Sequence, residues 1–136
     1  MADRLVADQT EGSDAGALVC VVDDDESVRD SFRTLLESLG FVVTTYASGQ
    51  DVLVDDGRRQ ASLFIIDQHM PEMDGLMTVR GLRREGSSVP AILMTGRLDP
   101  EIAARATAFD VDAILEKPFS VARLLELLRA HSKPNR

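Results

Sequence analysis

The stretch Leu18-Val19-Cys20-Val21-Val22-Asp23-Asp24 decides the fold, because five apolar residues end directly in two carboxylates. Three later apolar runs have the same form: residues 63–66 end at Asp67, residues 91–94 end at Thr95, and residues 113–115 lead through Glu116 to Lys117. Short apolar runs that alternate with helical patterns are typical of buried parallel strands. The carboxyl ends of such strands share one edge of the sheet, where ligands bind. The sequence therefore predicts that three carboxylates, a hydroxyl and an ammonium meet at one edge.

The rest of the chain continues this alternation of strands and helices. We expect strands at about 18–23, 41–46, 62–67, 91–95 and 111–116. Helices are expected from the N-cap Asp25 to the stop at Gly40, after Ser48, from Asp74-Gly75 to Arg84, from Asp99-Pro100 to Ala108, and from Ser120 to about 130. Repeated strand–helix units imply an α/β fold, with a five-stranded parallel sheet covered by helices on both faces. The expected strand order is 2-1-3-4-5.

The length and composition favour one domain with an acidic surface. The 136 residues suit a single domain, which we expect at 17–130, between a flexible N-terminal tail at 1–16 and a C-terminal tail at 131–136. A formal net charge of −8 argues against direct binding to nucleic acid or to an anionic membrane. The apolar runs are too short to span a bilayer, and the N-terminus lacks a signal-peptide core. We expect a cytoplasmic protein whose single cysteine, Cys20, is a packed, inert thiol.

The residues expected at the strand ends suit magnesium-dependent phosphoryl transfer. Close carboxylates repel one another, and a divalent cation relieves this repulsion. Magnesium prefers oxygen ligands and binds phosphoryl oxygens. Asp67 could then act as a carboxylate nucleophile, while Thr95 and Lys117 stabilise the transferred group. Each residue also has an ordinary interpretation: an N-terminal helix acid, which we prefer for Asp25, a turn residue for Asp67, a strand end for Thr95 and a solvated side chain for Lys117.

Five segments, taken together and in order, resemble the response-regulator receiver family, the CheY-like phosphoacceptor domains with a flavodoxin-like fold. They are Val21-Val22-Asp23-Asp24, Ile65-Ile66-Asp67, Met70-Pro71-Glu72-Met73-Asp74-Gly75, Leu93-Met94-Thr95-Gly96 and Glu116-Lys117-Pro118-Phe119. The resemblance implies that Asp67 is the phosphoacceptor and that Mg²⁺ is bound directly by Asp24, Asp67 and the backbone carbonyl of His69, with Asp23 acting mostly through water. It also implies that Thr95 and Lys117 contact the phosphoryl group, and that the Lys117-Pro118 bond is cis.

The function implied is that of a receiver in a two-component phosphorelay. A histidine kinase or a phosphotransfer protein would donate the phosphoryl group, and the phosphoprotein would switch the binding of a downstream effector protein. Like its family, the chain should catalyse only its own phosphorylation and dephosphorylation, and is not otherwise an enzyme. Because no output domain fits in this chain, we expect a stand-alone receiver. A homodimer through helix 100–108, strand 111–116 and the last helix is possible.

Two departures from the family pattern and two alternative functions accompany this interpretation. The family's common inward-rotating aromatic is replaced by Ile114, and its Gly-Ala turn is replaced by Asp110-Val111. His69 and Arg97 are expected to line the mouth of the pocket, where His69 would tune the access of water. The alternatives are a small magnesium-dependent phosphohydrolase, which would need a substrate-specificity cap, and an unphosphorylated interaction module, in which pocket residues should be lost.

Overall fold

A five-stranded, fully parallel sheet with the order β2-β1-β3-β4-β5 forms the centre of the molecule. The computed structural model describes residues 16–132. Its strands are β1 (Leu18–Val22), β2 (Val42–Tyr46), β3 (Leu63–Asp67), β4 (Ala91–Thr95) and β5 (Ala113–Glu116). The predicted fold class and strand order are confirmed. The tails expected at 1–16 and 131–136 lie mostly outside the described residues.

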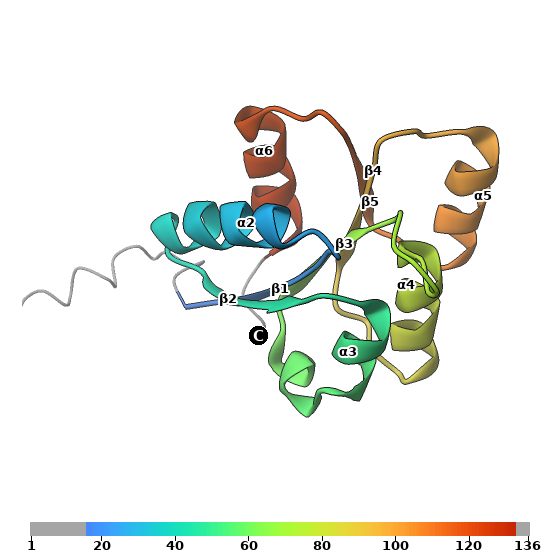
Figure 1. The fold of residues 1–136 in the computed structure, drawn as a ribbon, viewed down its shortest axis with the longest axis horizontal. Coiled ribbons are helices and arrows are strands. Elements are labelled where there is room, and N and C mark those ends of the chain that lie inside the picture. The colour runs from blue at the N-terminus through green and yellow to red at the C-terminus, as the bar shows by residue number, and fades with distance from the viewer. Residues whose placement is uncertain (1–15, 133–136) are drawn as a thin grey trace, which may run out of the picture.

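Helices cover both faces of the sheet (Figure 1). On one face lie α2 (Glu26–Ser38) and α6 (Val121–His131); on the other lie α3 (Gly49–Val54), α4 (Gly75–Arg84) and α5 (Pro100–Ala108). No helix between residues 16 and 132 combines the length and the apolar composition that a membrane crossing requires. The layered arrangement explains why the strands read as continuous apolar runs rather than as an alternation.

The central strands divide their side chains between two cores. Val19 and Val21 of β1 pack with residues of α2 and α6, whereas Cys20 and Val22 pack with α3 and α4. All four side chains are fully buried. Burial raises the pKa of the Cys20 thiol to about 12, so Cys20 is protonated at neutral pH. The full burial of Cys20 agrees with the expected packed thiol.

Side-chain caps fix where the helices begin. Five residues accept a backbone N–H from the first turn of the helix that follows each of them: Asp25, Ser48, Asp74, Asp99 and Ser120. Each cap satisfies an amide that has no partner within its helix. Each capping residue lies in the loop between a strand and the next helix. The caps therefore fix the point at which each of these loops ends and its helix begins.

Some element boundaries differ from the expected ones. A 3₁₀ helix, η1 (Asp56–Gln60), follows α3 and was not expected, and β5 begins at Ala113 rather than at residue 111. Helix α6 continues through His131, and its cap Ser132 is buried. The helical spacing of Val121, Leu124, Leu125 and Leu128 predicts that they share one buried face, but Val121 is 53% exposed. Leu127 takes its place in the core.

The turn before β5 uses Asp110 in a left-handed conformation, with a φ of 62°. An arginine of α4 stabilises this turn. Arg83 donates to the Asp110 carbonyl at 2.8 Å, to a carboxylate oxygen of Asp112 at 3.1 Å and to the Val89 carbonyl at 2.7 Å. The turn is therefore held by side-chain bonds at a position that usually favours glycine.

Strand β2 lies at one edge of the sheet, and no other strand within residues 16–132 pairs with its outward backbone groups. Arg33 of α2 covers part of this edge. Its guanidinium donates to the Val43 carbonyl at 3.1 Å and to the Thr45 hydroxyl at 3.4 Å. Charged side chains on edge strands oppose pairing with another chain.

Candidate functional site

Three carboxylates meet at the carboxyl edge of the sheet. Asp23 follows β1 and Asp67 ends β3, and these strands are neighbours in the sheet. Together with Asp24, each residue offers a carboxylate oxygen, and these oxygens all lie within 4.8 Å of one another. Asp23 is 1% exposed and Asp67 4% exposed, whereas Asp24 faces solvent. The structure thus brings together the acidic residues that the strand ends suggested.

Lys117 supplies a positive charge to this cluster. Its Nζ donates to Asp67 Oδ1 at 3.0 Å and lies 4.0 Å from Asp23 Oδ2. The Lys117 amide also donates to the Thr95 carbonyl at 2.8 Å, which fixes the loop after β5 against the end of β4. The Lys117-Pro118 peptide bond is cis. Lys117 therefore pairs with two of the three carboxylates, and the cluster has an excess of negative charge.

Asp23 tests whether the residues fit a cation. Its Oδ1 accepts the Asp25 amide at 2.9 Å, but its buried Oδ2 has no hydrogen-bond partner. Burial raises the pKa of Asp23; the charges of Asp67 and Asp24 add to the increase, while the Asp25 amide and Lys117 oppose it. A buried carboxylate oxygen without a partner is costly unless it is compensated. Asp23, Asp24 and Asp67 therefore fit a hard cation such as Mg²⁺.

Thr95 ends β4 beside this cluster and is fully buried. Its hydroxyl donates to the Arg97 carbonyl at 3.0 Å and accepts the Arg97 amide at 3.1 Å. The His69 Nε2 lies 3.3 Å from the same oxygen. His69 itself is exposed, in the loop that follows β3. The expected rim residues His69 and Arg97 are thus in direct contact with Thr95.

Gln68 and Gly75 also position Asp67, although neither was expected as a site residue. Gln68 is 4% exposed; its side chain accepts the Leu76 amide at 2.9 Å and donates to Asp74 at 3.1 Å. A Cβ at Gly75 would lie 2.5 Å from the Asp67 carbonyl oxygen, so helix α4 begins in contact with the backbone of Asp67. The dipeptide Asp74-Gly75 was a signal for the close approach, whereas Gln68 carried none.

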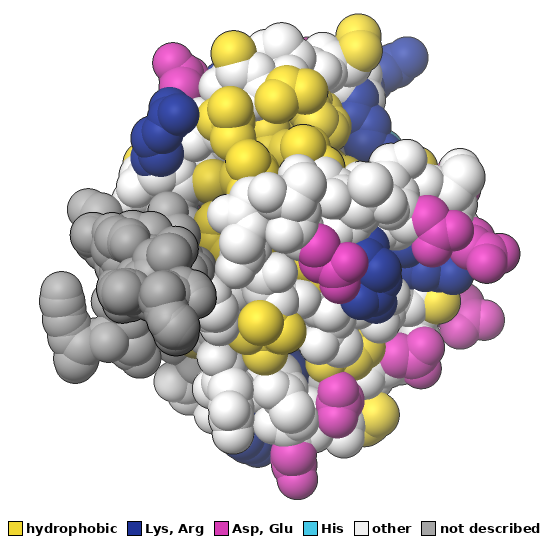
Figure 2. All heavy atoms as spheres, turned by 90° about the vertical axis from the view of Figure 1, so that its left-hand side faces the viewer, with side chains coloured by type: hydrophobic (Ala, Val, Ile, Leu, Met, Phe, Trp, Pro, Cys, Tyr) yellow, Lys and Arg dark blue, Asp and Glu magenta, His cyan; other side chains and the backbone are white. Residues whose placement is uncertain are grey.

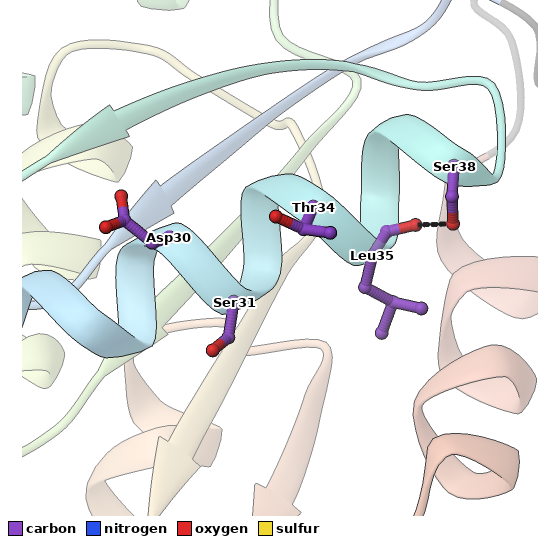
Figure 3. A pocket seen from close by; sticks show the side chains of 5 residues that line it. All are labelled: Asp30, Ser31, Thr34, Leu35 and Ser38. Carbon is purple, nitrogen blue, oxygen red and sulfur yellow. Dashed lines mark hydrogen bonds between the residues drawn. The ribbon is translucent and has the colours of Figure 1, made fainter.

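A groove of about 350 Å³ lies beside Lys117, between α2 and the loop before α6; Val28, Phe32 and Phe119 are among the residues that line it. Farther along α2 lies a shallower depression of about 490 Å³ (Figure 3), lined by Asp30, Ser31, Thr34, Leu35 and Ser38. Figure 2 views the side of the molecule on which α2 ends, away from Asp67, and shows apolar side chains gathered there at the height of α6. The surface beside Lys117 is itself partly apolar, because Val28, Phe32 and Phe119 line it.

Comparisons with known proteins agree with the fold and the site. The response regulator receiver domain family matches residues 19–129, and the chain belongs to this family. The chain is 32% identical over 121 residues to the response regulator protein TodT of Pseudomonas putida and 35% identical over 112 residues to the transcriptional regulatory protein FixJ of Azorhizobium caulinodans. These matches cover 89% and 82% of this chain, and each spans 53% of the relative.

Solved structures give the same result. The chemotaxis protein CheY4 of Vibrio cholerae superimposes with a TM-score of 0.80 at 29% identity, over 86% of this chain and 99% of that chain. A crystal structure titled FixJ-N superimposes with a TM-score of 0.77 at 30% identity, over 85% of this chain and 93% of that one. The protein is a receiver domain of the two-component response-regulator class, and the fold places its acidic cluster at the carboxyl edge of the sheet.

Proposed function

We propose that Asp67 accepts a phosphoryl group from a phosphohistidine of a histidine kinase or a phosphotransfer protein. The observation that carries this proposal is the contact of Lys117 Nζ with Asp67 Oδ1 at 3.0 Å, within a cluster that also contains Asp23 and Asp24. Mg²⁺ would be held by these three carboxylates and the backbone carbonyl of His69. When bound, it supplies positive charge that offsets the carboxylates and the phosphoryl oxygens.

The transfer exchanges one bond to phosphorus for another. A carboxylate oxygen of Asp67 attacks the phosphorus atom, an acyl phosphate bond forms, and the bond to the donor imidazole nitrogen breaks. The released imidazole keeps the electron pair and takes a proton from solvent. Lys117 can move from Asp67 to a phosphoryl oxygen, and Thr95 can donate its hydroxyl proton to another. Hydrolysis reverses the state: water attacks the phosphorus, and Asp67 and inorganic phosphate are released.

The surface beside Asp67 suggests where the phosphodonor docks. A donor histidine must reach Asp67 within bonding distance, so its protein must cover the rim next to Lys117. The groove between α2 and the loop before α6 begins there and offers Val28, Phe32 and Phe119 as apolar contacts. We assign this groove to the phosphodonor protein.

The output surface lies away from this groove. A phosphoryl group adds about −1.5 to −2 charges and strong acceptors, which can draw Thr95 and the loop before α5 toward Asp67. The surface of α5, β5 and α6 would then change for an effector protein or for a second copy of the chain. Because Ile114, which is half-buried on β5, stands where the family often has an aromatic, the proposed coupling relies on Thr95 and its loop. We place this exchange in the cytoplasm.

Mass spectrometry tests the proposal directly. Incubation with acetyl phosphate and magnesium should add one phosphate to the wild-type protein and none to Asp67→Asn. Equal labelling of both proteins would show that a residue other than Asp67 accepts the phosphate. No labelling of the wild type would favour an unphosphorylated interaction module, and sustained turnover of a phosphate monoester would favour a phosphohydrolase.

A further inference from the structure

The hydroxyl of Thr95 already uses its full hydrogen-bonding capacity. A threonine hydroxyl has one proton to donate and two lone pairs that can accept. The proton goes to the Arg97 carbonyl at 3.0 Å, and the Arg97 amide occupies one lone pair at 3.1 Å. The remaining lone pair is the one that can meet His69 Nε2 at 3.3 Å. The three contacts can exist together only if one uses the hydroxyl proton and each of the other two uses a different lone pair.

The same count bears on the proton of the imidazole. When the Thr95 hydroxyl donates to the Arg97 carbonyl, it has no second proton for His69. The contact is a hydrogen bond when Nε2 carries a proton and donates to Thr95. This arrangement of donors and acceptors requires the Nε2–H form of the His69 ring.

We propose that His69 is a positioning residue that holds the Thr95 hydroxyl against the Arg97 carbonyl before phosphorylation. The inference rests on the proposed function, because it concerns the uptake of a phosphoryl group by Asp67. To donate to that group, Thr95 must withdraw its proton from Arg97 and turn its oxygen. Turning the oxygen breaks the bonds that it accepts, including the one from His69. His69 thereby opposes the transition and raises the threshold for it.

The contact between His69 and Thr95 lies at the start of the segment that connects the site to α5. Thr95 is the last residue of β4, and Arg97 belongs to the segment that leads to α5. Capture of the hydroxyl by a phosphoryl group would free the Arg97 carbonyl and amide together. Gly96 lies in open space, with no atom within 4 Å of a Cβ built there, so the segment has room to move. His69 thus controls a coupling that does not depend on an aromatic at Ile114.

Two substitutions separate the hydrogen bond from the bulk of the ring. Leucine in His69→Leu fills similar space without a donor, whereas the amide of His69→Gln can replace Nε2–H. We would titrate each protein with beryllofluoride, a phosphoryl mimic, in the presence of magnesium and follow amide NMR spectra. Since one hydrogen bond contributes modestly in water, His69→Leu should bind about 2- to 10-fold more tightly, and His69→Gln should stay close to wild type. Equal or weaker binding by His69→Leu would overturn the inference.

A double-mutant cycle shows whether the effect passes through Thr95. In a Thr95→Val background the hydroxyl is gone, so His69→Leu should no longer change the affinity for beryllofluoride. An unchanged gain in that background would refute the proposed role of His69.

A second readout needs neither metal nor phosphoryl mimic. Nitrogen-15 spectra of the metal-free protein should show the Nε2–H form of His69, and the Arg97 amide should exchange faster in His69→Leu than in His69→Gln. The Nδ1–H form, or equal exchange, would contradict the proposal. Wild-type protein that neither binds beryllofluoride nor gains phosphate would remove the proposed function, and this inference with it. If the wild-type protein binds beryllofluoride and both His69 variants bind it with the same affinity, only the inference about His69 is refuted.

Discussion

The ionised carboxylate of Asp23 destabilises the folded protein. Its Oδ2 is buried without a hydrogen-bond partner, and burial raises the pKa of Asp23. A raised pKa in the folded state means that folding favours the protonated acid. The stabilising contribution is complete below the unfolded value, about 3.9, and is lost as the pH rises through the folded value. At neutral pH the ionised Asp23 therefore lowers the free energy of unfolding.

Replacing Asp23 by asparagine should relieve this cost. In EDTA at pH 7, Asp23→Asn should raise the free energy of unfolding by about 1–2 kcal/mol, because the amide keeps an acceptor for Asp25 without a buried charge. The gain should shrink as the pH falls toward 4. Urea denaturation at several pH values measures both effects. A variant that is less stable than wild type at pH 7 would show that Asp23 is already compensated within the protein.

At the scale of elements, helix α4 and strand β3 meet at a point with no spare room. A methyl group at Gly75 would lie 2.5 Å from the Asp67 carbonyl and 2.8 Å from a methyl carbon of Leu93. Gly75→Ala should therefore lower the free energy of unfolding by about 1–3 kcal/mol and slow the uptake of phosphate, since Asp67 must shift. Gly57→Ala is the matched control, because its Cβ would meet its nearest neighbour at 3.5 Å. Equal effects of both substitutions would mean that the contact at Gly75 is easily relieved.

The elements also show what the sequence can and cannot predict. The strands were identified correctly because burial on both faces leaves uninterrupted apolar runs before Asp23, Asp67 and Thr95. The rotation of α6 was not, since Val121 and Leu127 both lie near an apolar stripe and only packing on the sheet selects Leu127. The contacts of Gln68 could not be predicted from the sequence either, because they depend on the position of the first turn of α4.

At the scale of the whole molecule, the acidic cluster predicts stabilisation by magnesium. A cation that binds only the folded protein adds about 2.7 kcal/mol at a hundred times its dissociation constant, or roughly 5–10 °C in Tm. Asp24→Asn should abolish most of this gain in a thermal melt. Asp30→Asn removes the same charge from an exposed position of α2 and should keep the gain. Equal loss in both variants would indicate that magnesium acts through the net charge of −8 and not through the cluster.

The arginine on the margin of β2 has a consequence for assembly. With Arg33 bonded to Val43 and Thr45, a second sheet cannot add there without displacing a guanidinium. Two copies that associated through the edge of the sheet without displacing Arg33 would have to use the opposite margin, at β5. A pair joined at β5 would leave α2 and the entrance to Asp67 exposed. Each copy could then still accept a phosphoryl group from its own donor protein while the two remained together.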